Sequence, residues 1–312
     1  MGIEKNLDHQ GKITIVGAGH VGSHCAMSLS GCHVGNEIVL VDIDARKAEA
    51  QALDVSDALS SFPSHGSVRA GTYEDCADAD IVVIAIGEQW KPGQTRLDLL
   101  DASIVMLKGL LAKLKPLNLR GIVITITNPA DIVADYVRRG LGLSRNRVFA
   151  TGTLLDSARL VRILSEMTGL DRASITAFSL GEHGDSSMIP FSQIRLGGRS
   201  FSSFGALDRT LILERTRRSG MEIIEGKGST EFGIGQALAS LCRSIFRDEK
   251  CVLPLSVALD GEYGQREVSC GIPCRVGRGG IETIVEFDLT EIELAQLAES
   301  CDVIRKYMEL SK

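Results

Sequence analysis

The first half of the chain alternates between short apolar runs and longer segments in which apolar residues recur with helical spacing. The run 81–86 is apolar at every position, as a parallel strand buried on both faces requires. We predict strands at 12–16, 37–41, 68–71, 81–86 and 121–126. We predict helices at 21–30, 45–59, 102–114 and 132–138. Strands that alternate with helices favour a doubly wound, parallel (Rossmann) sheet of the α/β class.

The pattern changes near residue 150. A long helix is predicted at 154–167, opened by Thr153, and short strands follow at 175–178 and 194–196. Further helices are predicted at 207–224, 234–244 and 291–308, and three consecutive strands at 251–259, 267–276 and 281–287. Short glycine turns between those three strands favour an antiparallel meander. We therefore expect an α+β substrate domain over 151–312, packed closely against a first domain over 1–150.

Charge and composition exclude several classes of protein. Lys and Arg total 34 against 40 Asp and Glu, a formal net charge of −6, so nucleic acid and anionic membranes are poor partners. No apolar run approaches the roughly 18 residues that a membrane span needs. The polar start at 1–10 lacks the apolar core of a signal peptide, which leads us to expect a cytoplasmic protein.

Neither the cysteines nor the histidines predict a metal site. None of the eight cysteines forms a Cys-x-x-Cys pair, and in a cytoplasmic chain we expect them to be reduced. His20, His24 and His33 do not follow a known ligand spacing, and no carboxylate falls between the first two. We expect no bound metal.

The segment Gly17-Ala18-Gly19-His20-Val21-Gly22 matches the dinucleotide motif Gly-x-Gly-x-x-Gly. It follows a predicted strand and opens a predicted helix, which is the context the motif requires. Gly17 permits the tight turn, Gly19 lets the backbone approach a pyrophosphate, and Gly22 lets helix and strand pack closely. The helix start at His20 and Val21 then offers free N–H groups to the phosphates.

A second feature supports a dinucleotide site. Asp42 ends the strand 37–41, 20 residues after Gly22, where a carboxylate binds ribose hydroxyls and repels a 2′-phosphate. This predicts NAD rather than NADP as the cofactor. We take Gly87, after the strand 81–86, and Asn128, after the strand 121–126, as further cofactor contacts.

Three other segments contain residues suited to catalysis. Gly181-Glu182-His183-Gly184-Asp185 places a histidine between glycines in a loop. Asp156 and Arg159 are three residues apart and therefore share one face of a predicted helix. The loop 91–96, rich in glycine and proline, ends in Arg96.

Together these segments resemble the L-lactate/L-malate dehydrogenase family, which includes the broader L-2-hydroxy acid dehydrogenases. The resemblance runs from about residue 12 to 307. The motifs occur in the family's order, with Asn128-Pro129 and Lys227-Gly228-Ser229-Thr230 among them. The resemblance implies an NAD-dependent oxidoreductase that interconverts a 2-hydroxy acid and its 2-oxo acid.

The resemblance also implies a role for each candidate residue. His183 would be the general acid and base, since an imidazole reaches both protonation states near neutral pH. Asp156 would orient the imidazole ring and stabilise its charged form. Arg159 would bind the substrate carboxylate through two hydrogen bonds. Arg96 would polarise the carbonyl from a closing loop, and Asn128 would bind substrate or nicotinamide.

Substrate choice depends on Trp90, just before the loop 91–96. This position resembles Gln in typical lactate dehydrogenases and Arg in malate dehydrogenases. A malate enzyme needs a cation for the second carboxylate, so we disfavour oxaloacetate. Trp90 either fills the pocket and suits pyruvate, or packs against a larger apolar side chain such as that of 2-oxoisocaproate; it could also pack only against a helix. Thr230 resembles the pocket threonine of lactate-type enzymes and fits a neutral substrate.

The resemblance bears on assembly and regulation too. Family members are dimers or tetramers, so we expect a homo-oligomer with contacts through 56–59 and 160–167. Bisphosphate-activated bacterial relatives carry Arg and His where this chain has Val161 and Thr176. We therefore predict no activation by fructose 1,6-bisphosphate, although Arg162 lies beside the first position.

Two alternatives come from other classes of protein. A nucleotide-binding sensor could keep the fold without the chemistry, but it would not need His183, Asp156, Arg159 and Arg96 together. A short-chain reductase needs Tyr-x-x-x-Lys, and none of the four tyrosines is followed by lysine at that spacing.

Overall fold

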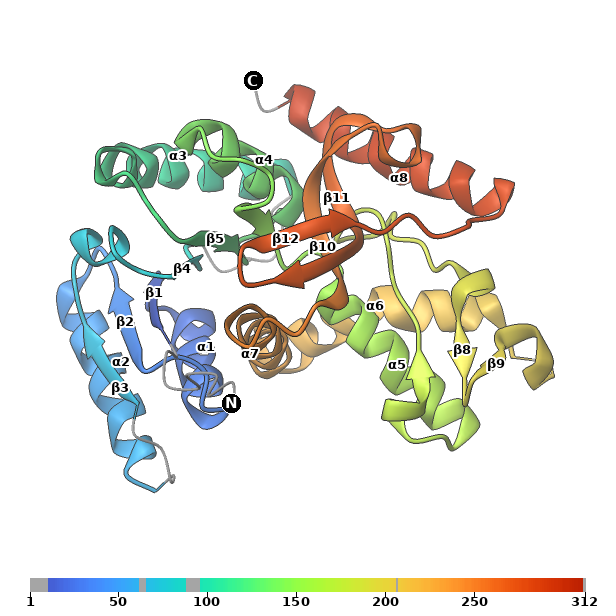
Figure 1. Ribbon diagram of the computed structural model, residues 1–312, viewed down its shortest axis with the longest axis horizontal. Coiled ribbons are helices and arrows are strands. Elements are labelled where there is room, and N and C mark those ends of the chain that lie inside the picture. Colours follow the sequence, from blue (N-terminus) through green and yellow to red (C-terminus); the bar gives the residue numbers. More distant parts are fainter. Residues whose placement is uncertain (1–10, 62–65, 88–95, 206, 311–312) are drawn as a thin grey trace, which may run out of the picture.

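The computed structural model describes residues 11–61, 66–87, 96–205 and 207–310, with backbone only for 96–101 and 310. Its centre is a nine-stranded mixed sheet with helices on both faces (Figure 1). The strand order is β12-β11-β10-β6-β5-β4-β1-β2-β3. The last six positions of that order form the parallel, doubly wound sheet expected from the sequence.

The parallel half follows the predicted alternation closely. Its strands are β1 (Lys12–Val16), β2 (Glu37–Val41), β3 (Ser67–Ala70), β4 (Ile81–Ile84), β5 (Ile122–Thr125) and β6 (Val148–Ala150). Its helices are α1 (His20–Gly31), α2 (Ala45–Leu59), α3 (Arg96–Leu114) and α4 (Ala130–Leu141). Strand β6 was not predicted, because three apolar residues directly before a glycine turn give too short a pattern.

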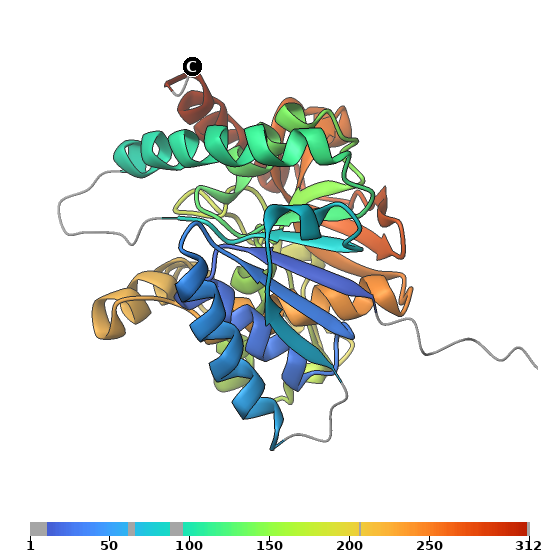
Figure 2. The ribbon, with the colours of Figure 1, turned by 90° about the vertical axis from the view of Figure 1, so that its left-hand side faces the viewer.

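Alternation along the buried strands assigns side chains to the two faces of the sheet. Ile13 and Ile15 of β1 belong to the core under α1, whereas Val16 belongs to the core under α3 and α4. In β4, Ile81 and Val83 face the first core, and Val82 and Ile84 face the second. Both faces are covered, as Figure 2 shows for α2 and α3, which explains why β4 is apolar at every position and why β1 is buried along most of its length.

The antiparallel meander continues the same sheet. Strands β10 (Cys251–Asp260), β11 (Arg266–Gly277) and β12 (Gly280–Ile284) pair antiparallel, as predicted. Strand β10 then pairs with β6 through Ser256 and Ala150. One sheet therefore runs through both halves of the chain, a link that the sequence pattern did not reveal.

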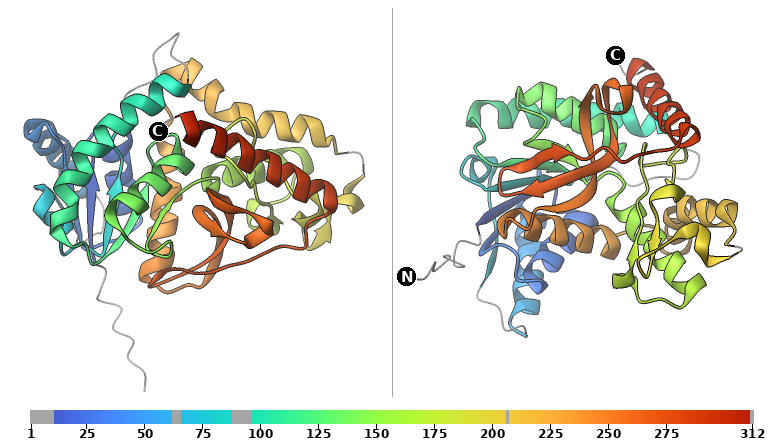
Figure 3. Two further views of the ribbon diagram at one scale, coloured as in Figure 1. Left: turned by 90° about the horizontal axis from the view of Figure 1, so that it is seen from above. Right: turned by 45° about the vertical axis from the view of Figure 1, so that its right-hand side comes forward.

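The remaining elements surround this sheet. The helices are α5 (Leu154–Thr168), α6 (Arg209–Lys227), α7 (Phe232–Phe246) and α8 (Glu291–Leu310). A small antiparallel sheet is formed by β7 (Ile175–Thr176), β8 (Arg195–Leu196) and β9 (Arg199–Ser200). Seen from above, α8 runs alongside α6 (Figure 3). Across the described residues, no helix is long and apolar enough to cross a membrane.

Candidate active site

The glycine turn after β1 has the geometry that a dinucleotide needs. Gly17 has a φ of +108°, and a Cβ there would lie 2.5 Å from the carbonyl oxygen of Ala85. A Cβ on Gly22 would lie 1.8 Å from the carbonyl oxygen of Gly17, so helix α1 packs directly on the turn. Gly19 is the N-cap of α1, where the first N–H groups of the helix have no intrahelical acceptor. An anion is therefore favoured at this turn.

Asp42 lies beside that turn, as the sequence predicted. Its carboxylate accepts hydrogen bonds from the backbone N–H of Ala18 at 2.7 Å and of Asp44 at 3.1 Å. Lys47 Nζ lies 3.8 Å from the same carboxylate and 3.9 Å from the position of a Cβ on Gly19. The carboxylate is thus fixed at the end of β2, next to the phosphate-binding turn.

The other predicted cofactor contacts share this edge of the sheet. His20, exposed, and Val21, half-buried, form the first turn of α1. Gly87 is exposed just beyond β4, and Asn128 follows β5 immediately before α4. All of them follow the carboxyl ends of parallel strands, where ligands bind in such sheets.

His183 lies at the tip of a hairpin loop. Leu180 and Met188 pair across the base of this loop, and Gly181 exchanges two backbone hydrogen bonds of 2.8 Å with Gly271 of β11. Gly181 has a φ of +87°, a conformation that glycine adopts without steric cost. The loop is therefore held on the central sheet with the histidine at its end.

Asp156 and Arg159 of α5 meet this histidine, which brings the three predicted residues together. Asp156 Oδ2 lies 2.5 Å from His183 Nδ1, and Asp156 Oδ1 accepts from Arg159 Nη1 at 2.9 Å. Because Asp156 occupies Nδ1, His183 Nε2 is left for a bound substrate. Arg159 lies flat against α6, where a Cβ on Gly220 would be 3.2 Å from Nη1.

The charges of this group shift its protonation equilibria. The negative charge of Asp156 raises the pKa of His183 above its ordinary value, against the effect of burial. Burial raises the pKa of Asp156, but His183 and Arg159 outweigh it, and the pKa lies below its ordinary value. The pair therefore favours an imidazolium beside an ionised carboxylate, and His183 is suited to donate a proton at neutral pH.

These residues line a cavity of about 250 Å³. Sequence reasoning placed His183, Asp156, Arg159 and Asn128 in it, and the structure does so too. It missed several other lining residues: Asp131, Ile132, Glu182, Asp185, Arg217, Gly220, Met221, Ile224, Ile304 and Tyr307. For Asp131 a signal existed, because an acid stands three residues after Asn128 in the first helical turn. The contributions of α6 and α8 depend on tertiary packing and left no local signal.

Three predicted residues are not among the described residues that line this cavity. Thr230 lines a neighbouring hollow of about 260 Å³ that shares Arg159 with the catalytic cavity. Trp90 and the loop 91–95 lie outside the described residues. Arg96 is described only as the first backbone position of α3.

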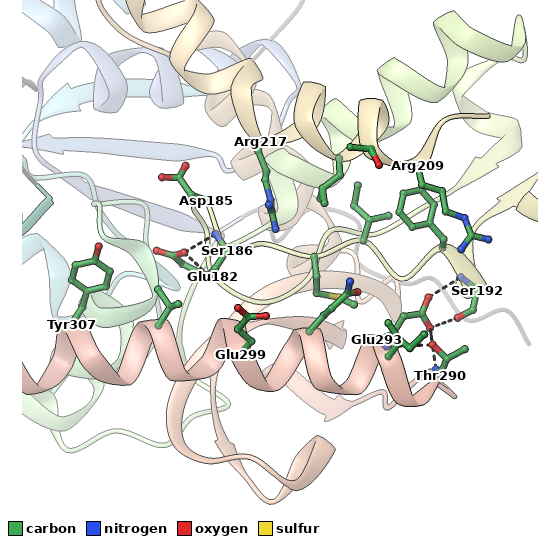
Figure 4. A pocket seen from close by; sticks show the side chains of 18 residues that line it. Glu182, Asp185, Ser186, Ser192, Arg209, Arg217, Thr290, Glu293, Glu299 and Tyr307 are labelled. Atoms are coloured by element: carbon green, nitrogen blue, oxygen red, sulfur yellow. Dashed lines mark hydrogen bonds between the residues drawn. The ribbon is translucent and has the colours of Figure 1, made fainter. Parts of the chain in front are cut away.

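A larger hollow of about 900 Å³ adjoins the catalytic cavity between the loop after His183, α6 and α8 (Figure 4). The two share Glu182, Asp185, Arg217 and Tyr307. Arg217 donates to the carbonyl oxygen of Ser187 at 2.9 Å through Nε. It therefore ties α6 to the loop that carries His183.

Comparison with known proteins accounts for this arrangement. The family model of the lactate/malate dehydrogenase NAD binding domain matches residues 11–150, and that of the alpha/beta C-terminal domain matches 153–312. This chain belongs to the lactate/malate dehydrogenase family. It is therefore an NAD-dependent oxidoreductase, and the glycine turn with Asp42 fits that cofactor.

Individual relatives cover nearly the whole chain. The chain is 42% identical to L-lactate dehydrogenase 3 of Bacillus anthracis, covering 96% of this chain and 98% of the relative. It is 40% identical to an L-lactate dehydrogenase of Fusobacterium nucleatum, covering 96% and 97%.

Solved structures of the family share the fold. A lactate dehydrogenase, MGS-M5, from a Medee basin deep-sea metagenome library has a TM-score of 0.92 and 34% identity, covering 96% of this chain and 98% of its own. The minor L-lactate dehydrogenase of Enterococcus mundtii has a TM-score of 0.93 and 32% identity, covering 97% and 98%. Among the described residues, no group of three or more His, Cys, Asp or Glu could hold a metal ion.

Proposed function

We propose that this dehydrogenase interconverts pyruvate and L-lactate with NAD. The observation that carries the proposal is the placement of the His183–Asp156 pair beside Arg159 in one cavity. A proton donor next to a cation is what a 2-oxo acid requires, since its carbonyl must be protonated while its carboxylate is held. The names of the relatives, which are L-lactate dehydrogenases, point to the same substrate and the L configuration.

His183 acts on the carbonyl oxygen through Nε2. In reduction the imidazolium donates its Nε2 proton to that oxygen, and in oxidation the neutral ring takes the proton back from the hydroxyl. Asp156 keeps the Nδ1 proton in place and stabilises the charged ring. Arg159 anchors the substrate carboxylate, so the reacting carbon lies at a fixed distance from Nε2.

The remaining candidate residues complete the proposed site. When bound, the cofactor would supply the hydride as NADH in reduction and accept it as NAD⁺ in oxidation. Asp42 and the glycine turn hold its adenosine end and its pyrophosphate, and Asn128 contacts its nicotinamide end or the substrate. We assign to Arg96 the polarisation of the carbonyl, and to Trp90 and Thr230 a contribution to substrate choice.

A larger 2-hydroxy acid is the second candidate, and the cavity wall favours it. Met221, Ile224 and Ile304 give this wall an apolar character, and Gly220 adds no side chain to it. A branched or aromatic substituent would bury apolar area there.

A substrate panel separates the candidates. NADH oxidation is followed at 340 nm with pyruvate, 2-oxoisocaproate, phenylpyruvate and oxaloacetate, and kcat/KM is compared. We expect pyruvate to lead. A lead for a larger oxo acid supports the second candidate, and a lead for oxaloacetate points to Arg217, the second arginine of the cavity wall. No activity with any of the four would return the sensor hypothesis.

A homo-oligomer in the cytoplasm belongs to the same proposal. All eight cysteines are free, which fits a reducing compartment. Leu53 on α2 is 65% exposed, three residues from the segment 56–59 that the family resemblance assigns to subunit contacts. Light scattering after size exclusion should give a mass of two or four chains.

A further inference from the structure

Asp131 contacts the catalytic histidine from a direction that Asp156 does not use. It lies in the first turn of α4 and is 3% exposed. Its Oδ2 accepts the backbone N–H of His183 at 2.8 Å. His183 is thus held by two carboxylates, Asp156 at the ring and Asp131 at the backbone, on helices that follow different strands of the sheet.

A backbone hydrogen bond alone does not require a carboxylate at this position. A neutral amide oxygen would accept the same N–H, and burying an unpaired charge is costly. The second oxygen of Asp131, Oδ1, is buried, and the polar side chain that faces the carboxylate is the neutral hydroxyl of Ser256 rather than a cation. Burial raises the pKa of Asp131 to about 6, so at neutral pH the site still carries a negative charge that the fold disfavours.

Asp135, one turn further along α4, shows how this fold compensates a buried carboxylate. It is equally buried, and its two oxygens pair with Arg138 at 2.9 Å and Arg139 at 2.6 Å. Asp131 forms no ion pair with a described arginine or lysine. The positive charge of His183 lowers the pKa of Asp131, and the negative charge of Glu182 raises it.

We propose that Asp131 is a positioning residue that fixes the backbone of His183 and, through its charge, favours the protonated imidazole. This rests on the proposed reaction, in which His183 is the proton donor. The negative charge of Asp131 raises the pKa of His183, adding to Asp156 and opposing Arg159. The other titratable or charged groups of the cavity wall are Glu182, Asp185, Arg217 and Tyr307.

The first test measures His183 in the protein without cofactor. Asp131→Asn keeps the size and the hydrogen-bond acceptor and removes the charge. The histidine Cε1–H resonance that disappears in a His183→Gln variant is followed against pH by NMR. We expect its midpoint to fall by about one pH unit in Asp131→Asn. Asp135→Asn removes an equally buried carboxylate from the same helix and should leave the midpoint in place.

The second test uses the two directions of the reaction. Reduction needs the imidazolium and oxidation needs the neutral ring, so the pH limbs of kcat/KM in both directions should move to lower pH in Asp131→Asn. Asp131→Glu, which restores the charge, should return both limbs toward the wild type. A purely structural residue would lower activity in both directions without moving either limb.

The unfolding temperature gives a third test, and the raised pKa of Asp131 determines the direction in which the temperature should change. A carboxyl whose pKa is raised in the folded state makes folding less favourable as pH rises through that value. Asp131→Asn should therefore unfold at an equal or higher temperature than the wild type at pH 8. Loss of a structural contact would give a lower unfolding temperature at every pH.

The outcomes are separable. An unmoved midpoint in Asp131→Asn overturns the proposal, and so does failure of both Asp131→Asn and Asp131→Ser to fold. If the wild type reduces no 2-oxo acid, the proposed function fails, while the NMR midpoint still decides whether Asp131 sets the protonation of His183.

Discussion

Replacing Asp156 by Asn tests the proposed proton donor most directly. The change keeps the shape of the side chain and removes its charge. In the wild type, one Asp156 oxygen accepts a hydrogen bond from Arg159 and the other pairs with His183 Nδ1. An amide cannot accept at both atoms, so its NH₂ group must face one of two donors. If it faces the ring, the neutral imidazole carries its proton on Nε2 and cannot accept the hydroxyl proton in oxidation.

The structure gives the size of the effect. The Asp156 and His183 side chains are 10% and 23% exposed, so water screens the pair only weakly. Two unit charges about 4 Å apart interact by about 4 kcal/mol at an effective dielectric constant of about 20. Loss of that stabilisation corresponds to a fall in kcat of about 10³-fold. The wrong tautomer of His183 lowers kcat further. A comparable substitution in a serine protease triad lowers kcat by about 10⁴-fold.

The assay compares both directions across pH. NADH absorbance at 340 nm gives kcat and kcat/KM for pyruvate reduction and lactate oxidation, and NADH fluorescence gives cofactor affinity. We expect cofactor affinity to be unchanged. We expect the pH at which kcat/KM for pyruvate reduction declines to move to a lower value. The reason is that the Asp156 charge, the main cause of the raised His183 pKa, is lost. Glu166→Gln, which removes an exposed carboxylate from the same helix, is the matched control.

Two results would refute this reasoning. A kcat within tenfold of the wild type would remove Asp156 from the mechanism. A large fall in kcat with an unmoved pH limb would mean that Asp156 supports the fold of α5 rather than the charge of His183.

Three further predictions concern the groups around this pair. Arg159→Lys should raise the KM for the oxo acid by about 100-fold and spare NADH affinity, because a lysine cannot form the paired hydrogen bonds; parallel losses in both affinities would contradict the assigned role. Gly220→Leu should raise the same KM by displacing the Arg159 guanidinium, 3.2 Å from a Cβ at that position, and an unchanged KM would show that the cavity accommodates the side chain. Gly17→Ala should weaken NADH binding at least tenfold and lower the unfolding temperature, because its φ of +108° and the nearby Ala85 carbonyl oxygen leave no room for a Cβ. Gly31→Ala, at an open position, should have neither effect.

Much of the fold was accessible from local pattern. Apolar and β-branched runs identified β1, β2, β4 and β5, because each strand is buried on both faces. The glycine motif and Asp42 were recognisable because a tight turn and a ribose contact impose residue types at fixed spacing. His183, Asp156 and Arg159 were found through family motifs, and their spacing alone would not have joined a loop to a helix 27 residues away.

Other features followed only from packing. The pairing of β6 with β10, through Ala150 and Ser256, depends on contacts more than 100 residues apart along the chain. The contribution of α6 and α8 to the cavity wall also depends on packing, since Gly220 and Tyr307 look like ordinary helix positions in sequence. Thr230, three residues after the motif lysine Lys227, lines a hollow that shares Arg159 with the catalytic cavity, a position that only packing reveals.

The sequence by itself determined the order of strands and helices, the dinucleotide turn and the chemical groups of the site. Those features are set by backbone sterics and hydrophobic periodicity, which act over a few residues. Tertiary structure alone decided which carboxylates reach His183 and how large the cavity is. Asp131 shows why: it looks like a first-turn acid of an ordinary helix, and it acquires a role only because the fold brings the backbone of His183 to within 2.8 Å of its carboxylate.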